Sequence, residues 1–133
     1  LVWPVVSNDA VITLQSGERV HPITGETMII DHICIGGAEK GTDIIASASG
    51  VVKEAGYDAR NGYYLILQCA DDMELHYRHC ETLLVTEGTQ VQMYDKIATL
   101  GQTGDVTGPC LSFAVYQNGE PLYLCSAPAY EAK

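Results

Sequence analysis

The chain has 133 residues and more acidic than basic side chains, and its length and charge limit the classes of protein to which it can belong. Its 7 basic and 17 acidic residues give a formal net charge of −10, which repels phosphate backbones and anionic lipids and so disfavours nucleic-acid binding. No apolar run reaches the roughly 18 residues that span a bilayer. We expect residues 1–133 to form one domain, with a lead-in segment at 1–14 and a frayed tail at 129–133, cut from a longer protein.

The first half of the chain predicts strands joined by polar turns. Residues 1–14 predict an extended lead-in, and residues 15–25 predict a polar loop punctuated by Gly and Pro. Residues 28–35 are apolar and β-branched and predict one strand. Residues 42–56 predict two strands around a central turn, and residues 63–69 predict a buried strand.

The second half continues the pattern. Residues 73–80 predict a strand that forms a hairpin with residues 63–69. After a Gly-rich turn, residues 111–116 predict a strand, and Asn118–Gly119 marks a hairpin turn toward residues 122–124. Short strands with Gly-rich turns and no long helical periodicity favour an all-β fold.

Strand alternation indicates which side chains share a face, since residues i and i+2 point the same way. His32, Cys34 and Gly36 are expected on one face of their strand. Cys110 and Ser112 are likewise expected to point together at the start of the strand that follows the Gly-rich turn. Any chemistry at this strand start is therefore carried by that Cys and Ser together.

The same rule applies to residues 73–80. It places Tyr77 and His79 on one face together with Leu75, and it places Cys80 on the other face with His76 and Arg78.

Several spaced motifs resemble those of the lysostaphin/LytM-type zinc endopeptidases, which cut bacterial cell-wall peptides. His32-Ile-Cys-Ile-Gly36 falls on the motif His-x-Gly-x-Asp, and Tyr77-Arg-His79 falls on Tyr-x-His. The stretch from Gly101 to Phe113 resembles the last motif, which carries His-x-His. Arg19, His21, Pro22 and Gly25 match the first signature of that family. The resemblance implies a largely antiparallel all-β domain of two packed sheets with a groove across one of them.

The resemblance also implies where a zinc ion would be held. In that family the ligands are the His and Asp of His-x-Gly-x-Asp and the second His of His-x-His. Here His32 stands at the first position, Gly36 at the second and Ser112 at the third, while Cys110 replaces the other, non-ligand His. A catalytic zinc needs three protein donors. We therefore expect no catalytic residue, no metal and no cofactor.

Three alternatives stay open for the remaining donors. His32, Cys34, His79 and Cys110 could form a rewired Cys₂His₂ metal site. Cys34 and Cys110 could instead form a disulfide across the former zinc site. In the third alternative the thiols only fill space, the two His side chains are hydrogen-bonded and Tyr77 packs with its hydroxyl satisfied. An odd number of cysteines without a CxxC pair excludes a disulfide framework that uses them all: Cys34, Cys69, Cys80, Cys110 and Cys125.

The function implied by the resemblance is that of a degenerate, non-catalytic LytM-like domain in a bacterial envelope, extracytoplasmic or secreted. It would bind cell-wall peptide or glycan, or an envelope protein partner, as a regulator, scaffold or sensor, with membrane contact only through an anchor outside this sequence. The alternative is an enzyme, either a zinc metallopeptidase with altered ligands or a thiol hydrolase using Cys110 with His79. The oligomeric state stays open. The residues expected to line the inherited groove are His32, Cys34, Gly36, Tyr77, His79, Cys110 and Ser112.

Overall fold

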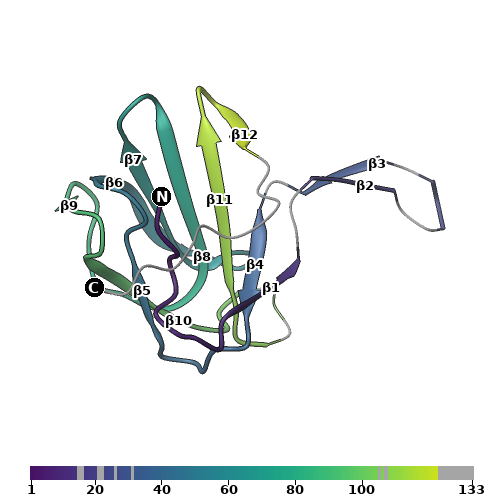
Figure 1. Cartoon of the computed structure of the whole chain (residues 1–133), viewed down its shortest axis with the longest axis horizontal. Helices are drawn as coiled ribbons and strands as arrows, with labels where there is room; N and C mark the ends of the chain where they lie inside the picture. Colours follow the sequence, from purple (N-terminus) through teal and green to yellow (C-terminus); the bar gives the residue numbers. More distant parts are fainter. Residues whose placement is uncertain are drawn as a thin grey trace.

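A computed structural model describes most of the chain. The described residues are 1–14, 17–20, 23–25, 27–30, 32–104, 106 and 108–122. Within these ranges the secondary structure consists of strands without any helix (Figure 1), which confirms the all-β class. It follows for the same residues that no helix is long and apolar enough to cross a membrane. The predictions for His21, Pro22, Cys125 and the tail at 129–133 lie outside the described residues.

The strands are short, as the frequent Gly and polar turns predict. In chain order they are β1 (Val11–Leu14), β2 (Gly17–Val20), β3 (Thr27–Ile30), β4 (Ile33–Gly36), β5 (Asp43–Ile45), β6 (Gly50–Asp58), β7 (Gly62–Cys69), β8 (Met73–Leu83), β9 (Gln90–Val91), β10 (Lys96–Leu100), β11 (Leu111–Gln117) and β12 (Glu120–Leu122).

Ten of the described strands form one antiparallel sheet. Seven of them follow the order β1-β4-β11-β8-β7-β6-β9, β12 pairs with β11, and β5 and β10 form a branch. The sheet branches, because β8 also pairs with β10, which in turn pairs with β5. Side chains of the β5–β10 branch pack in one core with those of β4, β7, β8 and β11. The two layers expected from the resemblance are thus parts of a single hydrogen-bonded sheet that encloses its own core.

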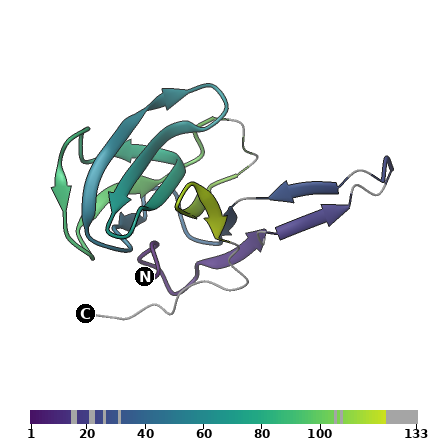
Figure 2. The same cartoon turned by 90° about the horizontal axis from the view of Figure 1, so that it is seen from above.

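The strands β2 and β3 form a separate two-stranded hairpin, which projects away from the main sheet (Figure 2). This corrects two predictions. Residues 15–25, expected to form only a loop, contain β2, and residues 28–35, expected to form one strand, are divided between β3 and β4. The division has a simple cause: β3 pairs with β2 in the hairpin, whereas β4 pairs with β1 and β11 in the main sheet, so the chain changes partners.

The hairpins predicted in the second half are confirmed. β7 and β8 pair along their length, and β11 and β12 pair around Asn118 and Gly119. Both turn residues have positive φ, 54° and 80°, as a tight two-residue hairpin turn requires.

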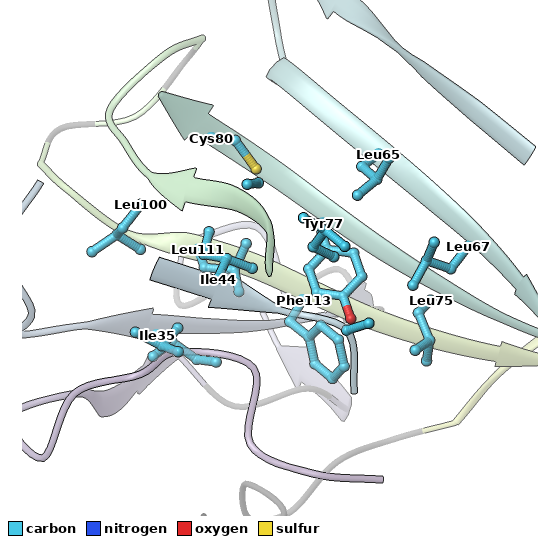
Figure 3. Close-up of a cluster of buried hydrophobic side chains, with 14 of the residues drawn as sticks. Ile35, Ile44, Leu65, Leu67, Leu75, Tyr77, Cys80, Leu100, Leu111 and Phe113 are labelled. Atoms are coloured by element: carbon cyan, nitrogen blue, oxygen red, sulfur yellow. The ribbon is translucent and has the colours of Figure 1, made fainter. Parts of the chain in front are cut away.

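The core lies on the inner face of the sheet (Figure 3). Ile33 and Ile35 of β4 lie there, with Tyr77 of β8 and Phe113 of β11. The two aromatic rings meet edge to face with centroids 5.2 Å apart. From the lead-in segment, Val5 is fully buried and bridges to β5, so this segment helps to close the core.

A β-bulge in β8 overturns one prediction. Leu65 of β7 pairs with Tyr77 of β8, and Tyr63 pairs with Cys80. The two pairs are two residues apart in β7 but three residues apart in β8, so β8 contains one extra residue. The extra residue lets Cys80 join Tyr77 in the core, and His79 takes a left-handed φ of 68°. The expectation that Tyr77 and His79 share a face, with Cys80 opposite, is therefore wrong, because alternation assumes an uninterrupted ladder.

Candidate functional site

The candidate site lies on the face of the sheet opposite the core, where β4, β11 and β8 run side by side. Cys34, Ser112 and Arg78 stand opposite one another across the three strands. Their neighbours along the chain, including Ile33 and Phe113, point into the core. Ser112 is only 1% exposed, while Cys34 and Arg78 are half-buried. We call this surface, with His32, His79 and Cys110, the site face.

Two thiols meet on the site face. Cys110 forms a bridge with Gly101 just before β11 begins, and its side chain hydrogen-bonds that of Cys34 in β4. Both cysteines are free thiols in the structure. A disulfide between them, one of the alternatives left open by the sequence, needs such a contact and stays a prediction.

The two thiols have opposite electrostatic environments. A hydrogen bond between the Cys34 and Cys110 side chains, together with a hydrogen bond between Cys34 and His32 and the charge of the nearby His79, lowers the pKa of Cys34 from 9.0 to about 5. The same bond and burial raise the pKa of Cys110 far above its ordinary value. The pair, with His32 and His79 beside it, is thus a place where one thiolate is favoured, and a thiol hydrolase that uses Cys110 with His79 stays a prediction.

The β8 bulge places His79 near the thiols. Its backbone N–H donates to the Asn61 carbonyl at 2.8 Å, and its Nδ1 lies 2.9 Å from the Thr103 carbonyl. Because a carbonyl only accepts, Nδ1 carries the proton, and a neutral His79 keeps its lone pair on Nε2. The ring thus has a fixed tautomer, and the charge of its protonated form favours the Cys34 thiolate.

The residues at the family's ligand positions do not fit a zinc ion. Gly36 has no side chain, and a Cβ placed there would lie 3.1 Å from Cγ2 of Thr13 in β1, so a ligand side chain at this position requires Thr13 to shift. Thr13 is held in place by a hydrogen bond from its hydroxyl to the Cys34 carbonyl at 3.3 Å. Ser112 offers a neutral hydroxyl in place of an imidazole. Only His32 provides a donor of the expected kind.

The rewired alternative is not supported by the part of the chain that the structure describes. Among those residues, no group of three or more His, Cys, Asp or Glu side chains is arranged to hold a metal ion.

Tyr77 is placed in the core rather than at an open groove. It is fully buried, and its hydroxyl accepts from the Ser47 N–H at 3.0 Å and lies 3.4 Å from the Ile45 carbonyl. This is the packing role that the third alternative gave it. Burial raises the pKa of Tyr77, which therefore stays protonated.

Sequence reasoning missed a polar cluster farther along the site face. The Glu74 carboxylate lies 2.7 Å from Nζ of Lys53 and 3.1 Å from Nε2 of His76. The His76 ring packs against Tyr116 with centroids 4.7 Å apart. Alternation along residues 74, 76 and 78 was the one available signal, whereas the Lys53 contact comes from β6 and has no sequence signature.

An all-β domain with these motifs defines a class, the LytM/lysostaphin-type domains. The model of a family described as Peptidase family M23 matches residues 33–124, and the chain belongs to this family. Among curated proteins, the peptidoglycan DD-endopeptidase ShyC of Vibrio cholerae serotype O1 is 36% identical over 104 residues, which cover 76% of this chain and 23% of ShyC. The chain spans less than a quarter of the length of this relative and of the next, an uncharacterized metalloprotease of Haemophilus influenzae.

Solved structures agree on the fold. A zinc-containing peptidase from Vibrio cholerae superposes with a TM-score of 0.85 at 27% identity, over 96% of this chain and 39% of that one. A chain from the complex of SpoIIIAH and SpoIIQ superposes with a TM-score of 0.78 over 92% of this chain and 95% of that one. Its 18% identity shows the fold alone.

Proposed function

We propose that this chain is a non-catalytic M23 domain that binds cell-wall peptide or glycan in a bacterial envelope. The supporting observation is the state of the ligand positions: only His32 offers a zinc donor, and Thr13 fills the space beyond Gly36. A hydrolytic zinc needs three protein donors and an open position for water. The choice of ligand follows the curated relatives, several of which are named peptidoglycan DD-endopeptidases. The same names favour a location outside the cytoplasm.

A pocket beside the site face offers a binding surface. Its volume is about 440 Å³, and Glu81 and two tyrosines contribute to its lining. Tyr57 and Tyr63 are 60% and 41% exposed and meet edge to face with centroids 5.0 Å apart. The Tyr63 N–H donates to the hydroxyl of Thr103, whose carbonyl faces His79, so the pocket adjoins the site. Exposed tyrosines supply large, amphipathic contact area to ligands.

The test combines binding and hydrolysis. Purified cell-wall sacculi are incubated with the chain, with and without added zinc, and both the co-sedimented protein and the released fragments are measured. We expect co-sedimentation that Tyr57→Ala weakens, and no release of fragments with zinc. Zinc-dependent release that a chelator and His32→Ala both abolish would refute the proposal. No co-sedimentation would instead favour an envelope protein as the partner.

A gain-of-function variant gives the matched control. Gly36→Asp with Ser112→His restores the missing donors, and Thr13→Gly removes the methyl group that lies 3.1 Å from a Cβ at position 36. We expect zinc binding by the triple variant and not by Gly36→Asp alone. Equal zinc binding by the unaltered chain would contradict the account of the ligand positions.

A thiol hydrolase is the second candidate, favoured by one observation. The Cys34 side chain hydrogen-bonds Cys110 and His32, and its pKa is lowered to about 5, as a thiolate nucleophile requires. This candidate predicts release of cell-wall fragments that Cys34→Ala and iodoacetamide abolish and a chelator does not. Unchanged fragment patterns in that assay exclude it.

A further inference from the structure

The thiol pair on the site face has a geometry that neither a zinc peptidase nor a binding domain requires. Ser112 stands directly opposite Cys34 in the β4–β11 ladder, and Cys110 lies two residues before Ser112 on the same face. Cys110 precedes the ladder, and its N–H bonds Gly101 at 3.0 Å rather than β4. Its backbone can therefore move toward Cys34 without breaking a β4–β11 hydrogen bond, which lets the two sulfur atoms reach bonding distance.

The two sulfur atoms also differ in role. The Cys34 side chain interacts with His32 and lies near His79 as well as Cys110, whereas the Cys110 side chain, among the described residues, interacts with Cys34 alone. A thiol beside imidazole rings forms a thiolate most readily and attacks first, whereas a thiol without such neighbours attacks second, on the mixed disulfide that forms next to it. Cys34 is thus the residue that attacks a substrate disulfide, and Cys110 is the residue that resolves the mixed disulfide.

The other described cysteines lack this arrangement. Cys80 lies fully in the core, where burial raises its pKa to about 12. Cys69 is half-buried at the end of β7, and burial raises its pKa as well. These two residues serve as internal controls, since they share the chain and its solvent with the pair but not its hydrogen bonds.

We infer that Cys34 and Cys110 form a redox-active dithiol that exchanges with disulfides and closes into an intramolecular disulfide on the site face. The Cys34 thiolate attacks one sulfur of the disulfide substrate, and a mixed disulfide forms as the first substrate thiol leaves. Cys110 then loses its proton to solvent or to that departing thiolate and attacks the Cys34 sulfur, and the second substrate thiol leaves. Two protein thiols are oxidised and one substrate disulfide is reduced to two thiols. This inference does not rest on the proposed binding function.

The experiment uses oxidised glutathione as the probe on the folded, fully reduced chain. Free thiols are counted over time, and peptide mapping by mass spectrometry locates the products. We expect one disulfide between Cys34 and Cys110, two molecules of glutathione released per chain, and Cys69 and Cys80 still reduced. Cys110→Ser should stop at a stable glutathione adduct on Cys34. Cys34→Ser should slow the loss of thiols at least about tenfold.

The control variant is Cys69→Ser, which should react like the unaltered chain, and circular dichroism spectra show whether each variant is folded. The inference fails if the unaltered chain keeps both thiols under conditions that oxidise dithiothreitol. It also fails if a glutathione adduct on Cys34 persists with Cys110 present, or if mapping joins either residue to Cys69, Cys80 or Cys125 instead.

Discussion

The strands β4, β11 and β8 present two different faces, because alternate residues of each strand point to opposite sides of the sheet. The inner face carries Ile33, Phe113 and Tyr77, all fully buried. The outer face carries Cys34 and Ser112, with the bulge at His79, where the family's motifs have zinc-binding groups. The fold thus depends on the inner face and the chemistry on the outer face. The inner face can therefore keep the family's architecture while the outer face loses the family's zinc-binding side chains.

The comparison also shows why the outer face tolerates those changes. The Tyr77 and Phe113 rings contact each other in the core, so their loss leaves a cavity there. On the outer face, Thr13 already fills the space at Gly36, and the Cys34 and Cys110 thiols satisfy each other. The outer face is a packed and hydrogen-bonded surface in its own right, and the following variants test how independent the two faces are.

The largest effect is expected from Phe113→Ala on the inner face. Removing a fully buried ring that packs on Tyr77 should lower the free energy of unfolding by about 3–5 kcal/mol. Denaturant titration measures the loss. Ser112→Ala, one residue earlier and equally buried, is the control and should cost under about 1 kcal/mol. Similar losses at the two positions would show that the faces are not energetically distinct.

A smaller effect is expected from Tyr77→Phe. The variant keeps the ring but leaves the buried Ser47 N–H without the hydroxyl that accepts from it at 3.0 Å, at a cost of about 1–3 kcal/mol. Tyr64→Phe removes a hydroxyl that donates to Glu54 on the exposed surface and should change the melting temperature little. Thermal unfolding compares the two variants. Equal shifts would mean that the core hydrogen bond contributes nothing beyond an exposed one.

A pH-dependent effect is expected from the reduced thiol pair. The pKa of Cys34 is lowered from 9.0 to about 5, so the folded state binds fewer protons than the unfolded state between these values. This contribution to stability is lost as the pH falls from about 9 to about 5. Above about 9 the raised pKa of Cys110 acts in the opposite direction. Because both groups are half-buried, solvent screening keeps the effect modest.

Unfolding measured from pH 4 to 10 in reductant checks this prediction. The difference between the unaltered chain and Cys34→Ser should grow from pH 5 toward 9 and then decline. A difference that stays constant across this range would remove the support for a stabilised thiolate on the outer face.

The smallest effect is expected from Lys53→Met, on the outer face. Lys53 lies 2.7 Å from Glu74, but its side chain is 53% exposed, and exposed ion pairs contribute little. The melting temperature should shift less than in any variant above, and the shift should shrink further at high salt. A shift as large as that of Tyr77→Phe would show that the polar cluster around Glu74 and His76 supports the sheet.

Much of the fold could be predicted from the sequence. Short β-branched runs predicted most of the strands and Asn118–Gly119 predicted the last hairpin, because these signals are local and depend only on strand geometry. The motifs also carried the resemblance that the family match confirms.

The rest depended on contacts between residues far apart in the chain. The division of residues 28–35 into β3 and β4 follows from a change of strand partners that the apolar run does not reveal. Thr13, from the lead-in segment, fills the space at Gly36 only because β1 pairs with β4. The lowered pKa of Cys34 likewise depends on where His32 and His79 lie in space.

By itself, then, the sequence determined the all-β class and the loss of two of the three ligand types at Gly36 and Ser112. Only the tertiary structure decided that His79 reaches the outer face while Tyr77 and Cys80 lie in the core. The physical reason is the bulge in β8, which adds one residue to the ladder and reverses the alternation beyond it. Strand pairing sets such an insertion, and no single stretch of sequence contains both strands of the pair.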